Sequence, residues 1–367
     1  MVTGGASPLV VLLAAAAAVL VVLPVSPASA LPAGLPDIKP PFPNPWSAFK
    51  KLSGCHFGDE RRGLAKLKDY LWHFGYIPEA SSSGRFNDLF DADMELAIKT
   101  YQSNFGLRVT GELDVATVTQ MMAPRCGVAD VVNGTSTMGN SSAVGLRGRG
   151  LFSYFSGSPM WSKKTLKYAI ATSETSIDMA TLSLVFARAF ARWSAATMFS
   201  FTETAPDADA DITIGFHAGD HGDGSAFDGP LGTLAHAFSP TDGRLHLDAT
   251  ETWVADGDVT LASSADAFDL ESVAVHEIGH ILGLDHSSLP DSIMYPTIAP
   301  RTMKVNLAAD DVQGIQSLYE GNPNLEGAMP PTTSSRVMDM AAAVALSRPR
   351  YGLVGAAAAA VGLALAL

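Results

Sequence analysis

The stretch from His276 to His286 constrains the fold of this chain more than any other, because it places three histidines at spacings that one metal ion can join. A helix repeats every 3.6 residues, so His276 and His280 project from the same face on successive turns. Gly283 can adopt the left-handed backbone that ends a helix, and the turn then brings His286 toward the other two histidines. Glu277 lies beside the pair without being a good third ligand. The stretch therefore predicts a helix, a turn and a zinc site whose fourth position stays open, as in catalytic centres.

A second motif follows the third histidine. The residues Ser292-Ile293-Met294-Tyr295-Pro296 come shortly after it, and Ser287 follows it directly. Here the chain resembles the metzincin metalloproteases and, within them, the matrixins or matrix metalloproteinases, with Met294 in the methionine turn beneath the metal. The resemblance implies a zinc endopeptidase in which Glu277 acts as general base on the zinc-bound water.

The segment Pro124-Arg125-Cys126-Gly127-Val128-Ala129-Asp130, called the switch segment below, carries the second diagnostic pattern. A thiolate is a strong zinc ligand, so Cys126 can fill the open position and displace the water that catalysis needs. The segment is similar to the matrixin cysteine switch, which implies that Arg125 and Asp130 pair. Ala129 stands where the family usually has proline. A disulfide between Cys55 and Cys126 is the alternative; the role of Cys55 stays open.

The two ends of the chain carry apolar runs. We interpret residues 1–30 as a secretory signal peptide that ends at Ala28-Ser29-Ala30. Residues 321–340 form a linker, and residues 341–367 resemble a glycolipid (GPI) anchor signal, with a single-pass or peripheral tail as the alternative. Asn133 and Asn140 begin glycosylation triplets. These features predict a glycoprotein on the outer face of the plasma membrane, in the extracellular matrix or in the cell wall.

Between these ends we expect two domains. Residues 31–150 contain three helical apolar stripes, through Leu64 to Phe74, Met94 to Phe105 and Val115 to Met122, and then a linker. They resemble the peptidoglycan-binding-like prodomain of matrixins. Residues 151–320 alternate strands with long helices and predict an α+β fold. The strands are expected at 166–170, 198–202, 211–216, 233–238 and 244–248, and the zinc helix at 270–282. By resemblance this is a metzincin catalytic domain, a twisted mixed five-stranded sheet with three helices. We expect no propeller-shaped hemopexin-like domain to follow, by resemblance to the plant type.

A second group of metal-binding side chains precedes the zinc helix: His221, Asp223, His236 and His246. Three histidines and one aspartate form a closed tetrahedral set, which predicts a structural zinc. Carboxylates and carbonyls from a Gly-rich loop suit calcium. The resemblance assigns the calcium to side chains of Asp228, Asp248 and Glu251 and to carbonyls of Gly229, Leu231 and Thr233. A second calcium at Asp211 is disfavoured by the positive charge of Arg244.

Substrate binding is expected at an unpaired strand edge, residues 233–238, which offers backbone hydrogen bonds to an extended peptide of any sequence. The pocket beside the zinc would be walled by residues 296–298 and by Ser272. We expect it to prefer an apolar residue such as Leu just after the cleaved bond. By resemblance, Asp310 would receive the new amino terminus after prodomain removal.

The net charge of −13 provides no electrostatic footprint for nucleic acid. The partners are therefore expected to be protein or peptide substrates and, through the anchor, the membrane, with the enzyme itself a monomer. The alternative function is a catalytically inactive zinc-binding protein that acts in cell-surface adhesion. Against it stand Glu277 and Cys126, because a protein without activity needs no latency device.

Overall fold

The computed structural model describes residues 44–78, 86–138, 152–171, 173–206 and 208–319. The expected signal peptide, Asn140, the tail linker and the anchor signal lie outside these ranges. Within them, none of the helices has the length and apolar character needed to cross a membrane.

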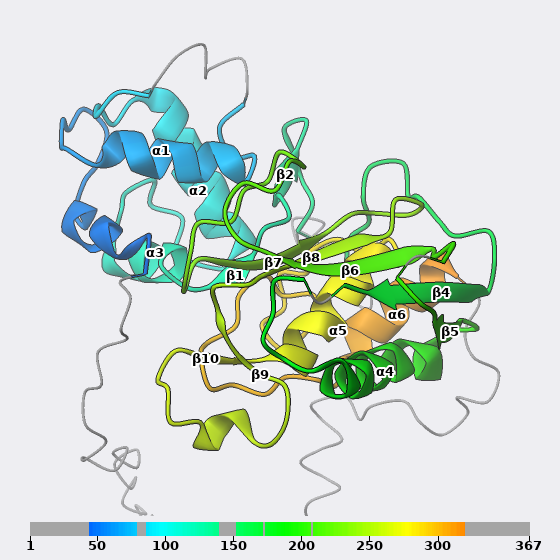
Figure 1. The fold of residues 1–367 in the computed structure, drawn as a ribbon. Coiled ribbons are helices and arrows are strands. Elements are labelled where there is room, and N and C mark those ends of the chain that lie inside the picture. The colour runs from blue at the N-terminus through cyan, green and yellow to red at the C-terminus, as the bar shows by residue number, and fades with distance from the viewer. Residues whose placement is uncertain (1–43, 79–85, 139–151, 172, 207, 320–367) are drawn as a thin grey trace, which may run out of the picture. The chain divides into compact units, whose positions relative to one another are not determined.

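The amino-terminal part is helical, as expected (Figure 1). A 3-10 helix at Ser47–Leu52 precedes α1 (Leu64–His73), α2 (Ala92–Asn104) and α3 (Val115–Met121). Asp91 and Asp114 cap α2 and α3 by accepting backbone N–H groups, which fixes where the two helices begin. The first two apolar stripes are buried. The third was wrong at its two ends: Val115 is 73% exposed and Met122 is only partly buried, whereas Val118 is buried as predicted, together with Thr117 and Met121.

Cys55 belongs to the core of this helical part. Its side chain is fully buried among apolar residues that include Leu52 and Leu64, and neither it nor Cys126 forms a disulfide. The alternative pairing of Cys55 with Cys126 is therefore wrong in this structure. Cys55 packs as a small apolar side chain.

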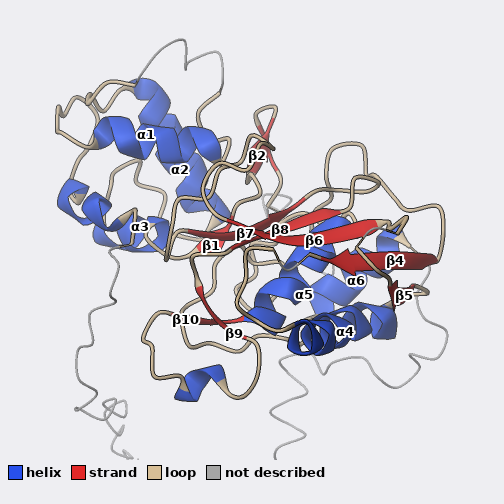
Figure 2. Ribbon diagram, viewed as in Figure 1, coloured by secondary structure: helices blue, strands red, loops and turns tan. Residues whose placement is uncertain are grey.

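A six-stranded mixed sheet forms the centre of the remaining part, in the order β1-β7-β8-β6-β4-β5 (Figures 1 and 2). Five strands come from the region where they were expected: β4 (Thr165–Ile170), β5 (Ser200–Glu203), β6 (Ile212–His217), β7 (Thr233–Ala237) and β8 (Arg244–Asp248). Strand β5 begins two residues later than predicted. Within this six-stranded sheet, β7 and β8 pair antiparallel and the other neighbouring strands pair parallel. The sixth strand, β1 (Arg125–Cys126), was not expected. It comes from the switch segment and lies on the edge that was assigned to substrate.

Helices α4 (Met179–Ala196), α5 (Leu270–Ile281) and α6 (Ala309–Leu318) pack on one face of this sheet (Figure 1). The apolar stripe of α4 is buried as predicted and includes Phe186, Phe190 and Trp193. Each such side chain stabilises the fold by about 1.5–3 kcal/mol through burial of apolar surface. The Trp193 indole also donates to the carbonyl of Val275 on α5 at 2.9 Å, so the zinc helix is tied to α4 by packing and by a hydrogen bond.

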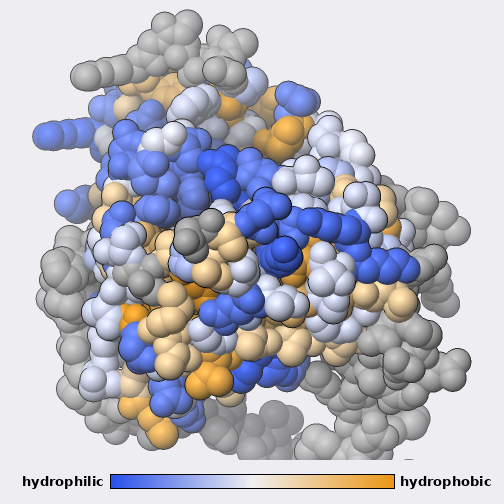
Figure 3. All heavy atoms as spheres, turned by 45° about the vertical axis from the view of Figure 1, so that its right-hand side comes forward, coloured by the Kyte–Doolittle hydropathy of each residue, from blue (hydrophilic) through white to orange (hydrophobic). Residues whose placement is uncertain are grey.

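Two small sheets complete the fold. Strands β9 (Thr252–Val254) and β10 (Ala267–Asp269) pair parallel, and β2 (Val131–Val132) pairs antiparallel with β3 (Thr135–Ser136). Asp269 ends β10 and caps α5 by accepting the Ser272 N–H, so the zinc helix begins where this strand ends. On the face drawn in Figure 3, hydrophobic side chains are interspersed with hydrophilic ones.

Candidate active site and metal centres

The three histidines of the 276–286 motif converge from α5 and the turn after it. His276 and His280 lie on one face of the helix with their Nε2 atoms 3.1 Å apart. Gly283 has a φ of +101°, and a Cβ there would stand 2.7 Å from the Pro159 carbonyl oxygen, so glycine is required for the turn. The chain then brings in His286, and the ligand atoms of these residues and Cys126 all lie within 4.8 Å of one another.

Each histidine ring is oriented by a hydrogen bond from Nδ1. His276 donates to the Ile293 carbonyl at 2.7 Å, and His280 donates to the Leu284 carbonyl at 2.9 Å. His286 donates to the Asp130 carboxylate at 2.9 Å. The Nε2 atoms therefore face one another, and His286 Nε2 is buried without a protein partner. Burial lowers the pKa of all three imidazoles, which favours the neutral form that binds metal. This donor set fits a zinc ion.

Glu277 lies fully buried beside these histidines. Neither carboxylate oxygen has a hydrogen-bond partner in the described structure. Burial raises the pKa of Glu277 to about 8, with the Cys126 side chain next to it. An unpaired carboxyl group at this depth is costly to stability and is typical of a group kept for chemistry.

Cys126 is held among the histidines by backbone pairing. Its Sγ lies 3.4 Å from His280 Nε2. The Arg125 N–H donates to the Gly232 carbonyl at 3.0 Å and the Gly127 N–H to the Ala235 carbonyl at 2.8 Å, on the β7 side. On the other side, the Cys126 N–H donates to the Pro296 carbonyl at 2.9 Å. Residue 127 must be glycine, because a Cβ there would stand 2.7 Å from Thr233 Cγ2.

Arg125 and Asp130 form an ion pair that is fully buried. The guanidinium donates to both carboxylate oxygens, at 2.6 and 2.8 Å, and stacks 3.7 Å from the centre of the Phe74 ring. Tyr76, which follows α1, donates its hydroxyl to the same carboxylate at 2.8 Å. Although burial opposes charge on Asp130, Arg125 and His286 hold its pKa well below the ordinary value. Asp130 thus receives donors from the helical part, the switch segment and the zinc motif.

Met294 packs against the zinc helix at Gly279. It is buried, and a Cβ on Gly279 would collide with its sulfur and stand 2.9 Å from Trp193 Cζ2. The Met294 carbonyl accepts the Ser287 N–H at 3.0 Å, which ties the turn to the residue after His286.

The second metal group is also brought together. One Asp223 oxygen lies 2.8 Å from a ring nitrogen of each of His221, His236 and His246. Burial lowers the pKa of His236 to about 4, so its imidazole is neutral. Four ligand atoms within 4.8 Å of one another, three of them imidazole nitrogens, fit a closed zinc site.

The carboxylates expected at calcium lie in one neighbourhood. Asp228 accepts the Thr233 N–H at 2.8 Å, and Glu251 accepts the Leu231 N–H at 2.7 Å. One oxygen of Asp248 and one of Glu251 are buried without a partner. Burial, with the neighbouring carboxylates, raises the pKa of Asp228 to about 6 and that of Glu251 to about 8. Buried carboxylates that repel one another are of the type that a hard cation binds, but among the described residues their oxygens do not form a group of three within 4.8 Å, as the two histidine sites do.

The three carbonyls expected at calcium belong to one segment, which also contacts the amino-terminal part. The segment runs through Gly229 and Leu231 to Thr233, and Leu231 has a φ of +70°. The Leu231 carbonyl accepts the Asn44 side chain at 2.7 Å. At the disfavoured second calcium, Asp211 pairs with Lys163, and Arg244 donates to Asp242 at 2.7 and 2.9 Å.

A pocket lies beside the histidines, lined partly by the residues expected from sequence. Ser272, Pro296, Thr297 and Ile298 are among them, with Leu234 of β7 and Val273 of α5. Lys304 was missed, since it lies in the loop before α6 and no motif marks it. Burial lowers its pKa to about 8, and its ammonium lies 5.6 Å from the centre of the Tyr295 ring.

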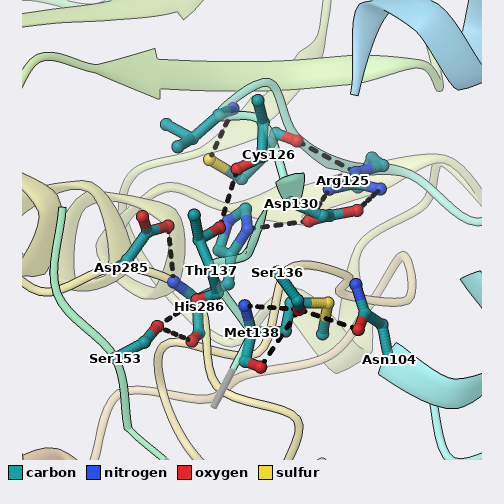
Figure 4. A network of polar contacts seen from close by, with 12 residues as sticks. Asn104, Arg125, Cys126, Asp130, Ser136, Thr137, Met138, Ser153, Asp285 and His286 are labelled. Carbon is teal, nitrogen blue, oxygen red and sulfur yellow. Dashed lines mark hydrogen bonds and ion pairs between the residues drawn. The ribbon is translucent and has the colours of Figure 1, made fainter. Parts of the chain in front are cut away.

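A polar network that includes Asp285 was also missed (Figure 4). Asp285 is buried and accepts the His286 N–H at 2.8 Å, and Ser153 donates to the His286 carbonyl at 2.8 Å. The position of Asp285 inside the 276–286 motif, directly before His286, was the sequence feature that could have indicated it.

Two further predicted residues lie outside the metal groups. Asp310 is buried and accepts the Ser287 hydroxyl at 2.7 Å. Asn133 is exposed in the turn between β2 and β3.

Comparison with known proteins agrees with this geometry. The matrixin family profile matches residues 160–320, and a peptidoglycan-binding domain profile matches residues 61–121. Metalloendoproteinase 2-MMP of Arabidopsis thaliana is 47% identical over 336 residues, which cover 86% of this chain and 87% of that protein. Metalloendoproteinase 1 of Glycine max is 46% identical over 299 residues, which cover 80% of this chain and 94% of that protein. Human Matrix metalloproteinase-20 is 40% identical over 226 residues, 60% of this chain and 41% of its own length.

The mixed α+β fold, the histidine-rich site and these relatives together define a zinc metalloendopeptidase, whose substrates are proteins. The chain belongs to the matrixin family, and plant members match it over most of its length.

Proposed function

We propose that this matrixin is a secreted, latent endopeptidase that is activated when the switch segment leaves the site. One observation carries the proposal: the Cys126 sulfur lies among the three histidines, on a strand that occupies the β7 edge. A thiolate there excludes the water that peptide hydrolysis needs. The same strand excludes a peptide from the edge where an extended substrate would pair.

The catalytic roles are assigned to the residues of the 276–286 motif. His276, His280 and His286 would hold zinc, which when bound polarises a carbonyl and acidifies water. Glu277, buried and unpaired, would take the proton from the attacking water and pass it to the leaving amine. Met294 would support the site from below. The pocket through Ser272 and Ile298 would receive the side chain just after the cleaved bond, with a preference for Leu.

Latency depends on how firmly the switch segment is held. The buried pair of Arg125 and Asp130 joins its two ends around Cys126. Truncating one partner of such a pair costs about 3–5 kcal/mol, because the other charge stays buried. Removal of residues 31–150 as the prodomain would therefore release the thiol and open the edge of β7. Asp310 is the residue proposed to receive the new amino terminus.

Two structural metal sites accompany this function in the proposal. A second zinc would be held by His221, Asp223, His236 and His246, where one carboxylate already contacts three imidazoles. Calcium would be held by Asp228, Asp248 and Glu251 with carbonyls of the same loop, which neutralises their mutual repulsion.

The proposed location is outside the cell. The signal peptide, residues 1–30, would direct secretion, and residues 341–367 would direct attachment of a GPI anchor. Asn133 and Asn140 would carry glycans, and the exposed position of Asn133 is compatible with this. The enzyme would act as a monomer on extracellular proteins.

The test measures cleavage of a quenched peptide with a Gly-Leu bond by the full chain, with and without a thiol-modifying reagent and a zinc chelator. We expect activity to rise with the reagent and to vanish with the chelator. Glu277→Gln should keep the zinc content of the parent and lose about 100-fold or more in turnover, the range for loss of a general base. Zinc per chain is measured by atomic absorption.

The matched control is Glu271→Gln on the same helix. Glu271 contacts Arg188 and Arg192 at 2.6 and 3.0 Å, away from the histidines. It should lose stability and keep most of its turnover. Near-normal activity of Glu277→Gln, or activity insensitive to both reagents, would contradict the proposal and favour the alternative of a zinc-binding adhesion protein.

A further inference from the structure

The three histidines of the zinc motif differ in what orients them. His276 and His280 each donate from Nδ1 to a backbone carbonyl, of Ile293 and Leu284, which belong to the same part of the chain. His286 donates to the carboxylate of Asp130, in the switch segment (Figure 4). Both residues of this last contact are fully buried. Only one of the three outer contacts therefore depends on the segment that leaves on activation.

Asp130 is itself held in place on its other side. It receives the Arg125 guanidinium and the Tyr76 hydroxyl, and Asn104 of α2 donates to the same hydroxyl at 3.2 Å. A continuous line of hydrogen bonds thus runs from the helical part through Asp130 to His286. A carboxylate so fixed sets which nitrogen of the imidazole carries the proton and where the ring points.

We infer that Asp130 is a positioning residue for His286, so that the switch segment strengthens zinc retention from outside the ligand shell as well as blocking the site with its thiol. This rests on the proposed function, since it takes the three histidines as zinc ligands. A charged acceptor on Nδ1 makes Nε2 a stronger donor to the metal and limits rotation of the ring. Loss of the segment on activation removes this acceptor. The latent chain is then the form in which zinc is loaded and retained most firmly.

The experiment measures zinc release from the latent full chain to a chelating dye. All variants carry Glu277→Gln, which prevents self-cleavage without removing a proposed ligand. The kinetic phase accelerated by Cys126→Ser is assigned to the catalytic zinc, and the other phase serves as an internal control. Asp130→Asn and Arg125→Gln are then compared. Both break the buried ion pair, but only Asp130→Asn removes the carboxylate from His286.

We expect Asp130→Asn to release the catalytic zinc about 10-fold faster than Arg125→Gln, the lower end of the effect of outer-shell changes on metal affinity. Equal rates, or faster release from Arg125→Gln, would overturn the inference, because the ion pair alone would then account for the effect. If no zinc is bound in a Cys126-sensitive phase, the proposed function fails instead.

A second measurement uses the parent chain and does not depend on how the variants fold. In the latent protein labelled with ¹⁵N-histidine, the His286 Nδ1 proton should give an exchange-protected, strongly downfield NMR signal. It should disappear when the prosegment is removed, whereas those of His276 and His280 should persist. Because His221 Nδ1 also lies 3.0 Å from a carbonyl, that of Gly219, the test depends on the change and not on the number of signals: if no protected signal is lost with the prosegment, the inference is overturned.

Discussion

Gly279 offers the sharpest test of how the zinc helix is packed. It lies on α5 between two zinc ligands of the proposed site, and a Cβ there would collide with the sulfur of Met294 and stand 2.9 Å from Trp193 Cζ2. Both neighbours are buried, and the Trp193 indole is held by its hydrogen bond to Val275. The added methyl group therefore has no open space to enter.

Two opposing effects decide the result of Gly279→Ala. Alanine improves helix propensity by about 1 kcal/mol. Overpacking a core costs about 1–3 kcal/mol, and the fixed indole places this site at the upper end. We expect a net loss of about 1–2 kcal/mol in the free energy of unfolding. For a domain of about 150–250 residues, each kcal/mol lowers Tm by about 2–4 °C.

The assay is differential scanning calorimetry of the latent chain carrying Glu277→Gln. Met294→Ala is the matched second change, because it opens the space that the new methyl group needs. The double variant should be more stable than the sum of the two single effects predicts, by about 1 kcal/mol or more. A higher Tm for Gly279→Ala, or additive effects, would refute the packing argument.

Three further predictions concern metal binding, specificity and latency. Glu251 has an ordinary pKa of 4.5 and a folded pKa of about 8, so without calcium the folded chain keeps a proton that the unfolded chain has lost. The free energy of unfolding should then fall as pH rises from 5 to 8 in EGTA, and thermal denaturation with saturating calcium should show a smaller decline, because only the part due to Glu277 and Asp285 remains; identical profiles would contradict it. Lys304→Met makes the pocket more apolar. It should raise kcat/KM for a peptide with Phe after the cleaved bond, relative to one with Leu, by about 10-fold at most. A peptide library measures this ratio, and an unchanged ratio would contradict the prediction. Arg125→Gln, made in the full chain with its native Glu277, leaves the Asp130 carboxylate buried without the guanidinium. It should shorten the lag that precedes activity when no thiol reagent is added. An unchanged lag would count against the role of the pair.

Much of this protein follows from short-range patterns. The spacing of His276, His280 and His286 predicts a helix and a turn, and α5 and Gly283 have the expected conformations. The apolar period of α4 predicts its buried face for the same reason, because helix geometry repeats over a few residues. The strands near 166–170 and 244–248 also form close to their predicted positions.

Other features depend on residues far apart in the chain, and local patterns carry no information about them. Val115 belongs to an apolar stripe in sequence but faces solvent, because α3 contacts the distant 3-10 helix at Ser47–Leu52 and buries Val118 and Met121. Lys304 lines the pocket only because the loop before α6 folds back toward α5. Each depends on where a whole element is placed in the fold.

The sequence by itself determined which side chains can bind metal, which glutamate lies beside them and which cysteine can block them, because motif spacing is a property of the local backbone. Only the tertiary structure decided that the Cys126 strand adds to the β7 edge and that Asp130 reaches His286, which lies 156 residues away along the chain. The physical reason is that strand pairing and buried hydrogen bonds form between surfaces, and those surfaces exist only after the helical part and the sheet have packed.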